Sequence, residues 1–170
     1  MKYILVLLLA ITWSACEQPS SRKVTEETSS AQAPAIDPAA KQFLIEITNL
    51  SWFQAQIAQA ALRKSTDTMI LSMAQRINKQ YIRIKDKAKI VSIPYQIDIP
   101  YFLTHGQNEE VQQLSQLDEA AFKSQFLEKI KHNNDVIMQK CAGVQTIQVD
   151  DSFQQLISFC KTTVESNTPK

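Results

Sequence analysis

The amino-acid sequence contains very little glycine and histidine. Only two of its 170 residues are glycine, Gly106 and Gly143. Tight β-hairpin turns and phosphate-binding loops depend on glycine, so this scarcity argues against a hairpin-rich sheet and against a nucleotide cradle. The two histidines, His105 and His132, belong to no Glu-x-x-His pair, and no nucleophile–base motif accompanies them. The sequence therefore gives no sign of a hydrolase, of a di-iron bundle or of any catalytic residue.

An excess of charge of either sign is also missing. The chain carries 18 basic and 17 acidic side chains, and the two numbers are equal once residues 1–16, with Lys2, are set aside. A neutral domain has no electrostatic footprint for nucleic acid. We therefore expect no nucleic-acid partner, and no motif in the sequence indicates a cofactor.

The N-terminus has an apolar run that is too short to span a membrane. Residues 3–11, YILVLLLAI, follow the basic Lys2, and a bilayer requires about 20 such residues. A basic start followed by a short apolar run is typical of an export signal.

Cys16 closes the sequence WSAC, which resembles the lipoprotein box of bacteria. In such signals the cysteine is lipidated and becomes the first residue of the mature chain, and its several acyl chains hold the protein at a membrane. The pattern usually has Leu, Val or Ile where this chain has Trp13. An ordinary secretory signal with an incidental cysteine is the alternative, but no Ala-x-Ala cleavage site lies nearby. We predict a lipoprotein-type signal peptide over residues 1–16 and a membrane anchor at Cys16.

Residues 17–36 have the composition of a disordered tether. Ser, Thr, Glu, Gln and Pro dominate the segment, so it cannot bury enough apolar surface to offset the entropy of ordering. Such a segment would connect the anchor to a folded domain. We therefore expect an exported protein that is anchored to a membrane of the bacterial cell envelope and faces the periplasm or the exterior.

The remainder of the chain predicts an all-α domain over residues 37–166. Asp37 suits a helix N-cap and Pro38 a first helical residue. Apolar residues then recur at helical spacing in four long segments and one short one. The predicted helices run from 38 to about 64, from a cap at 65–67 to beyond 88, over 107–116, from 119 to about 140, and from a cap at 150 or 151 to about 165. Residues 167–170 are expected to fray.

Two of these helices have especially clear apolar stripes. One carries Ile70, Met73, Ile77, Tyr81, Ile84 and Ala88. The other carries Phe122, Phe126, Ile130 and Ile137, with Asn133 or Asn134 on the same stripe. Stripes at this spacing mark the faces that pack together in a helical bundle.

The segment between these two helices predicts an extended crossover. Pro94 and Pro100 prevent a continuous helix. The segment is also rich in rings: Tyr95, Tyr101, Phe102 and His105. These side chains either form a surface for a ligand or partner, or cover the end of the bundle.

Five local patterns follow one another across residues 40–165. They are FLIEITNLSWFQAQIAQAAL, MILSMAQRI, KAKIVSIP, LSQLDEAAFKSQFLEKI and HNNDVIM. In this order and spacing they resemble the ferritin-like domain of unknown function found in exported bacterial proteins, often described as outer-membrane proteins or lipoproteins. The resemblance implies a ferritin-like antiparallel helical bundle with four main helices, one short helix and a long, proline-containing crossover.

The resemblance also implies positions for a metal site, and this chain departs from the family at most of them. The family typically has Asp-His where this chain has Gln80 and Tyr81, and a further His at the position of either Asn134 or His132. Helical periodicity directs Asn134 toward the core and His132 away from it. We therefore predict a degenerate site and no bound metal.

Cys141 and Cys160 are the two cysteines that remain once Cys16 is lipidated. An even pair in an exported protein is compatible with a disulfide. Cys160 lies about ten residues, or roughly 15 Å, into its helix, so the 142–149 loop would have to run back along the bundle to join them. Two buried apolar thiols are the alternative.

Two functional hypotheses follow from the sequence. In the first, the protein is a non-enzymatic cell-envelope lipoprotein whose helical bundle acts through contacts with an envelope protein or a surface. In the second, it is a metal- or small-ligand-binding ferritin-like stress protein with a degenerate site. The second rests on the resemblance alone, and a fold does not imply a function.

Overall fold

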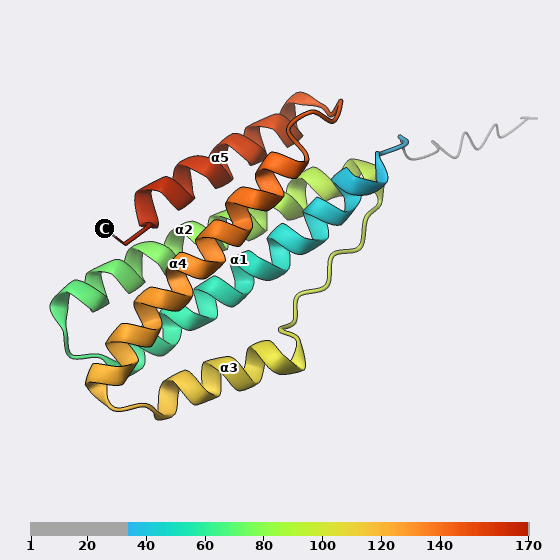
Figure 1. The fold of residues 1–170 in the computed structure, drawn as a ribbon. Coiled ribbons are helices and arrows are strands. Elements are labelled where there is room, and N and C mark those ends of the chain that lie inside the picture. Colours follow the sequence, from blue (N-terminus) through green and yellow to red (C-terminus); the bar gives the residue numbers. More distant parts are fainter. Residues whose placement is uncertain (1–33, 170) are drawn as a thin grey trace, which may run out of the picture. The chain divides into compact units, whose positions relative to one another are not determined.

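In a computed structural model, residues 34–169 are described, and all regular structure within them is helical (Figure 1). The elements are α1 (Pro38–Lys64), α2 (Thr68–Ser92), the short 3-10 helix η1 (Ile93–Tyr95), α3 (His105–Gln116), α4 (Glu119–Gly143) and α5 (Asp151–Asn167). The prediction of an all-helical domain is confirmed.

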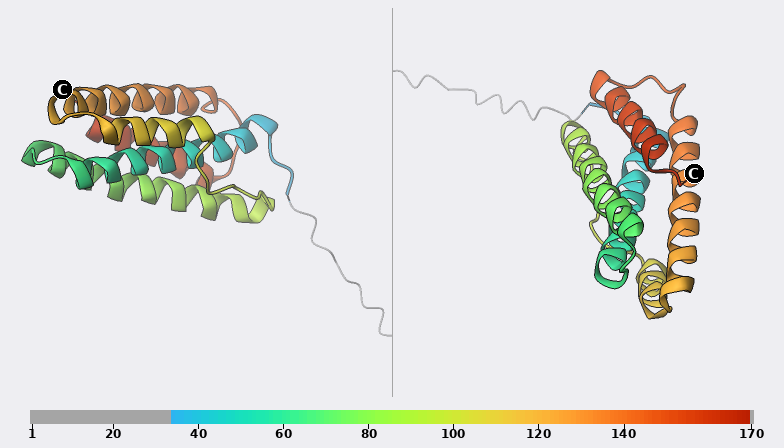
Figure 2. Two further views of the ribbon diagram at one scale, coloured as in Figure 1. Left: turned by 90° about the horizontal axis from the view of Figure 1, so that it is seen from below. Right: turned by 90° about the vertical axis from the view of Figure 1, so that its left-hand side faces the viewer.

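The helices form a bundle around α1. Helices α1 and α2 pack along their lengths as a hairpin, and α4 and α5 complete the bundle by packing against α1 and α2 respectively and against each other. Helix α3 lies on the outside, against α1 and α4 (Figures 1 and 2). The long crossover from α2 to α3 runs down the outside of the bundle (Figure 1).

Aspartate side chains begin four of the five α-helices. Asp37, Asp67, Asp118 and Asp150 each accept a hydrogen bond from a backbone N–H in the first turn of α1, α2, α4 and α5. These bonds satisfy donors that have no partner within the helix. Helix α3 instead begins with a reciprocal capping box between Thr104 and Gln107. The sequence named all four aspartates as caps, two of them among alternatives.

The core is made of the predicted stripes. Phe122, Phe126, Ile130 and Ile137 of α4 are all buried, and every member of the α2 stripe is buried except Met73, which is half-buried. The apolar face of α5 is buried throughout: Phe153, Leu156, Ile157, Cys160 and Val164. The ring of Phe153 packs against the ring of Phe43 of α1, with 5.4 Å between the two ring centroids.

Three predicted boundaries were wrong. Helix α4 continues through Gly143, so Cys141 is helical and not part of a loop. Helix α3 begins at His105, which therefore belongs to a helix and not to the crossover. The predicted fraying from residue 167 does not occur at Asn167, which is the last residue of α5 and fully buried. Hydrogen bonds to neighbouring helices hold this end in place, as described below.

The domain also begins before residue 37. Ile36 is half-buried and packs against the core. The segment 34–37 lies against Tyr95 and the 148–150 loop. The predicted tether therefore ends before residue 36. The signal peptide, Cys16 and residues 17–33 of the tether lie outside the described residues. Among the helices of residues 34–169, none combines the length and the apolarity needed to cross a membrane.

Candidate functional site

Tyr81 and Asn134 meet at the centre of the bundle. Tyr81 comes from α2 and Asn134 from α4, and neither side chain is exposed at all. The Tyr81 hydroxyl donates a hydrogen bond to Asn134 Oδ1 at 2.5 Å. Both residues were predicted to face the core, and the structure brings together these two positions, at which the resemblance implied a metal site.

Two further amides complete a group that we call the buried amide cluster: Gln54, Tyr81, Asn133 and Asn134. Gln54 Nε2 donates to Asn134 Oδ1 at 3.0 Å and to the backbone oxygen of Ile130 at 3.2 Å. Asn133 Nδ2 donates to Gln54 Oε1 at 2.8 Å. The cluster therefore links α1, α2 and α4 through one hydrogen-bonded network.

Sequence reasoning missed Gln54, although a signal for it was present. Gln54 is fully buried on α1. It lies seven residues after Ile47 and seven before Ala61, so it falls on the predicted core stripe at the spacing of two helical turns. A polar residue at such a position needs a buried partner, and Asn134 is that partner.

The C-terminal end of α5 is tied to this region. Asn134 Nδ2 donates to Thr168 Oγ1 at 3.3 Å. Asn167 donates to Gln80 Oε1 and accepts from Arg76 Nε at 3.0 Å. Gln80, the other α2 position that the resemblance implied, is half-buried and bonded to α5, beside the cluster and not in it.

The buried amide cluster is electrically neutral. Burial raises the pKa of the Tyr81 hydroxyl above its usual value, and the opposing hydrogen bond with Gln54 does not reverse this. Tyr81 is therefore a protonated donor at any physiological pH. The other three members are amides, which do not ionise.

The cluster does not fit the metal that the ferritin-like resemblance implies. Di-iron bundles hold their metals with inward-facing carboxylates and histidines, whereas the acceptors here are amide oxygens already occupied by N–H and O–H donors. His132, the fourth predicted position, is exposed on the outside of α4. Within residues 34–169, no three side chains of His, Cys, Asp or Glu lie close enough together to share a metal ion. The arrangement suits a structural network that holds three helices in register.

The outer surface carries an apolar groove between α1, α4 and the crossover, which we call the crossover groove. It has a volume of about 380 Å³ and is lined chiefly by apolar side chains: Ile45, Leu50, Pro100, Phe102 and Val136. Small-molecule sites are typically about 300–1,000 Å³ in volume, mostly apolar, with a few placed polar groups. In size and lining, the crossover groove matches such a site.

Polar groups fix the edges of the crossover groove. Asn49 Nδ2 donates to the backbone oxygen of Phe102 at 3.1 Å and so holds the crossover against α1. Lys140 Nζ and Glu46 Oε2 form an ion pair of 2.8 Å at the rim. Partial burial acts to raise the pKa of Glu46, but hydrogen bonds from Gln42 and Lys140 hold it below its usual value. Glu46 is therefore ionised at neutral pH.

Two rings of the crossover, Tyr101 and Phe102, are exposed. Phe102 is 65% exposed and Tyr101 is 42% exposed. The amines of Lys85 and Lys89 lie over the Tyr101 ring at 5.5 and 4.9 Å from its centroid. Tyr95 is half-buried and its hydroxyl donates to Asp150. Of the two expectations for the crossover rings, the covering role is therefore wrong for Tyr101 and Phe102.

A comparison with known protein families decides the membership of the chain. The sequence profile of a domain of unknown function, DUF4142, matches residues 25–167. The chain belongs to the DUF4142 family. No curated protein and no solved structure shows significant similarity to it. The matched range covers all five α-helices of the DUF4142 domain.

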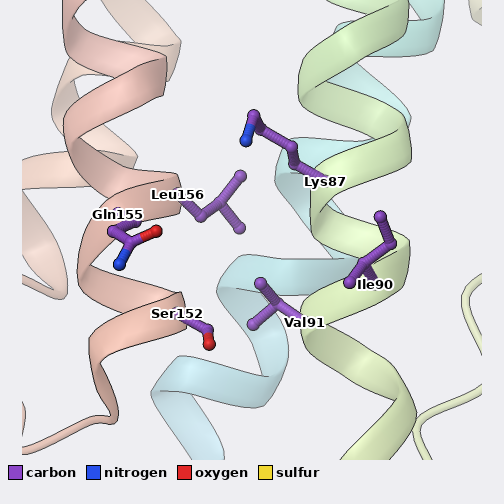
Figure 3. Close-up of a pocket in the computed structure, with 6 residues that line it drawn as sticks. All are labelled: Lys87, Ile90, Val91, Ser152, Gln155 and Leu156. Atoms are coloured by element: carbon purple, nitrogen blue, oxygen red, sulfur yellow. The ribbon is translucent and has the colours of Figure 1, made fainter.

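A second and smaller groove of the DUF4142 domain lies between α2 and α5. Figure 3 shows Leu156 and Ser152 of α5 across from Lys87 and Val91 of α2. Its volume is about 170 Å³, which is below the range of small-molecule sites. Its six lining residues include neither a carboxylate nor a histidine, and Lys87 is their one ionisable side chain.

The two cysteines of the described DUF4142 domain are both buried free thiols. The hydrogen bond with Cys160 lowers the pKa of Cys141, and the charge of Lys161 acts in the same direction, against the effect of burial. The same contact, together with burial, raises the pKa of Cys160.

Proposed function

We propose that this DUF4142 protein is a lipid-anchored, ferritin-like helical bundle of the bacterial cell envelope that works by binding a partner and not by catalysis. The anchor is Cys16 and the contact surface is the crossover groove. An envelope protein is the partner, and the bundle carries no metal.

The crossover groove is the observation that carries this proposal. Monomeric proteins rarely leave large apolar side chains grouped at the surface without a use for them. Phe102 projects beside the groove with 65% of its surface exposed, and aromatic residues are enriched at the centres of protein interfaces. The Glu46–Lys140 pair supplies a polar rim, which is the usual surrounding of such a centre.

The helix connections support the ferritin-like assignment. Four long helices, α1, α2, α4 and α5, build the bundle, and residues 93–118 form the long connection from α2 to α4 that includes α3. Ferritin-like bundles differ from simple up-and-down bundles by one such long crossover. The neutral amide cluster occupies the centre, where a ferritin-like enzyme would hold its metals.

Lipid anchoring is tested by replacing the thiol that would carry the lipid. In bacterial cells grown with labelled palmitate, the wild-type chain should take up the label and sediment with membranes. Cys16→Ser should do neither. Cys141→Ser is the matched control because it removes a cysteine of the bundle and should leave labelling unchanged. A wild-type chain without label, or a labelled Cys16→Ser chain, would refute the anchor.

The contact surface is tested by placing a photo-crosslinking phenylalanine analogue at residue 102 of the anchored chain. Irradiation of intact cells should give an adduct of one defined mass. The same analogue at Met69 is the control, because Met69 is 55% exposed but lies at the start of α2, away from the crossover groove (Figure 1). No adduct at 102, or the same adduct at both positions, would contradict a partner at the groove.

The alternative of a small ligand rests on the volume of the crossover groove. A ligand there would leave residue 102 without a protein adduct. It would instead raise the melting temperature of the chain, because a ligand that binds only the folded state stabilises it. Extraction of the purified chain into organic solvent, followed by mass spectrometry, would identify such a ligand.

A further inference from the structure

Cys141 and Cys160 come from different helices, and both are buried in the core of the bundle. Cys141 lies near the end of α4 and Cys160 in the second half of α5. Neither side chain is exposed at all, and both belong to the same hydrophobic core.

The register of α4 against α5 brings the two cysteines to one level. The hydrogen bond between Asn134 and Thr168 fixes the two helices relative to each other, and they run in opposite directions (Figure 1). Cys141 lies seven residues after Asn134, and Cys160 lies eight residues before Thr168. At 1.5 Å per residue these steps are about 10 and 12 Å, and both are close to two helical turns. The cysteines therefore lie at the same level of two helices that pack against each other.

A second contact joins α5 to the chain that follows α4, on the side of the cysteine pair toward the α4–α5 loop. Lys161 Nζ donates to Gln145 Oε1 at 2.9 Å. Lys161 directly follows Cys160, and Gln145 lies one turn beyond Cys141. The loop Val144–Asp150 thus carries the chain far enough past α4 for α5 to return alongside it, which the sequence did not predict.

We propose that Cys141 and Cys160 form an intramolecular disulfide that joins α4 to α5 once the chain reaches the cell envelope. The inference rests on the proposed function to the extent that export supplies an oxidising compartment. The oxidant is a disulfide of a thiol–disulfide exchange enzyme or of glutathione. Oxidation occurs while the α4–α5 contact is still open, since both thiols are enclosed in the folded chain.

The exchange proceeds in two balanced steps. The Cys141 thiolate attacks one sulfur of the donor disulfide, which forms a mixed disulfide and releases one donor thiolate. The Cys160 thiolate then attacks the Cys141 sulfur, which closes the protein disulfide and releases the second donor thiolate. The two protein protons go to the two released thiolates. The protein loses two electrons, and the donor disulfide is reduced to two thiols.

The disulfide would hold the C-terminal helix in place. Helix α5 supplies the contacts of Asn167 and Thr168 with Gln80 and Asn134. Separation of α5 from α4 would expose the buried amide cluster to water. A covalent bond at the level of Cys160 limits that separation, and by closing a loop it also restricts the unfolded chain.

The test counts reactive thiols in the denatured chain with a maleimide reagent of added mass. Chain taken from cells under thiol-trapping conditions should gain no adduct at these residues before reduction and two adducts after it. Cys141→Ala and Cys160→Ala should each gain one adduct without reduction. An additional adduct in every sample would come from an unmodified Cys16 and would count against the anchor, not against the disulfide. Two adducts from the wild-type chain before reduction would overturn the inference for the cell.

A second arm separates the geometry of the pair from the question of export. The purified full chain, reduced and then refolded in a glutathione mixture of envelope-like redox potential, should form the disulfide and melt about 5–10 °C higher than in reductant. Neither alanine variant should respond to reductant. Two free thiols after this treatment would overturn the inference whatever the location of the protein. Oxidation here, together with free thiols in cells, would show that export and not geometry had been misjudged.

Discussion

Replacing Asn134 by alanine is expected to destabilise the protein by about 2–4 kcal/mol. The substitution removes the one acceptor to which the Tyr81 hydroxyl donates among residues 34–169, and this hydroxyl has no access to solvent. A buried donor without an acceptor costs about 1–3 kcal/mol. Gln54 also loses one of its two acceptors, at a cost of about 1 kcal/mol, and the lost side-chain volume adds a smaller cavity cost.

The companion substitution Tyr81→Phe should cost only about 1 kcal/mol in the wild-type chain. It removes the hydroxyl but leaves Asn134 Oδ1 with the hydrogen bond from Gln54. In the Asn134→Ala background the same substitution removes an unpaired hydroxyl instead of a hydrogen bond. There it should be neutral or stabilising, so the two substitutions should be coupled by about 1–2 kcal/mol.

Urea unfolding of the four chains, followed by circular dichroism at 222 nm, gives each free energy of unfolding. An equal slope of the free energy of unfolding against urea concentration in all four chains would show that only stability has changed. The reasoning would be refuted if Tyr81→Phe cost the same in both backgrounds, because the hydroxyl would then not depend on Asn134.

Three further predictions follow from single contacts. The hydrogen bond from Tyr95, aided by the N–H of Phe153, holds the pKa of Asp150 below its ordinary value of 3.8. This contribution to stability is therefore present above pH 3.8 and is lost as the pH falls through the lower value of the folded state. Tyr95→Phe should be less stable than the wild-type chain at pH 6, and the difference should shrink below pH 3.8 in pH-dependent melts. Thr104→Ala removes the capping box of α3 and should cost about 1 kcal/mol, with faster hydrogen exchange at the Gln107 amide as its local sign. Phe102→Ser should change stability by less than about 0.5 kcal/mol, because the ring is largely exposed. The substitution should nevertheless weaken any contact made at the crossover groove. A large loss of stability would mean that the ring is part of the core.

The sequence predicted the features that depend on a single helix. A helix start needs only a side chain such as Asp67 near its own first turn. The apolar stripe that contains Tyr81 follows from the 3.6-residue period. Asn134 was assigned to the core on the same ground, although periodicity did not separate it from Asn133, and both are buried.

The features that the sequence did not predict depend on how helices pair. Gln54 was overlooked because its role appears only when α1 faces α4. The meeting of Cys141 with Cys160 depends on the stagger of α5 against α4, which the path of the 144–150 loop sets. The crossover groove likewise arises where Phe102 is held against α1 by Asn49, a contact between residues 53 positions apart in the chain.

The electrical neutrality of the bundle centre is the central claim, and metal binding tests it most directly. The purified chain would be analysed for its metal content and melted with and without Fe²⁺, Mn²⁺ and Zn²⁺. The neutral amide cluster predicts no stoichiometric metal and no rise in melting temperature with any of the three ions. One metal per chain, with a melting temperature that rises with its concentration and returns to the metal-free value in Asn134→Ala, would contradict the account and favour a metal-binding ferritin-like protein.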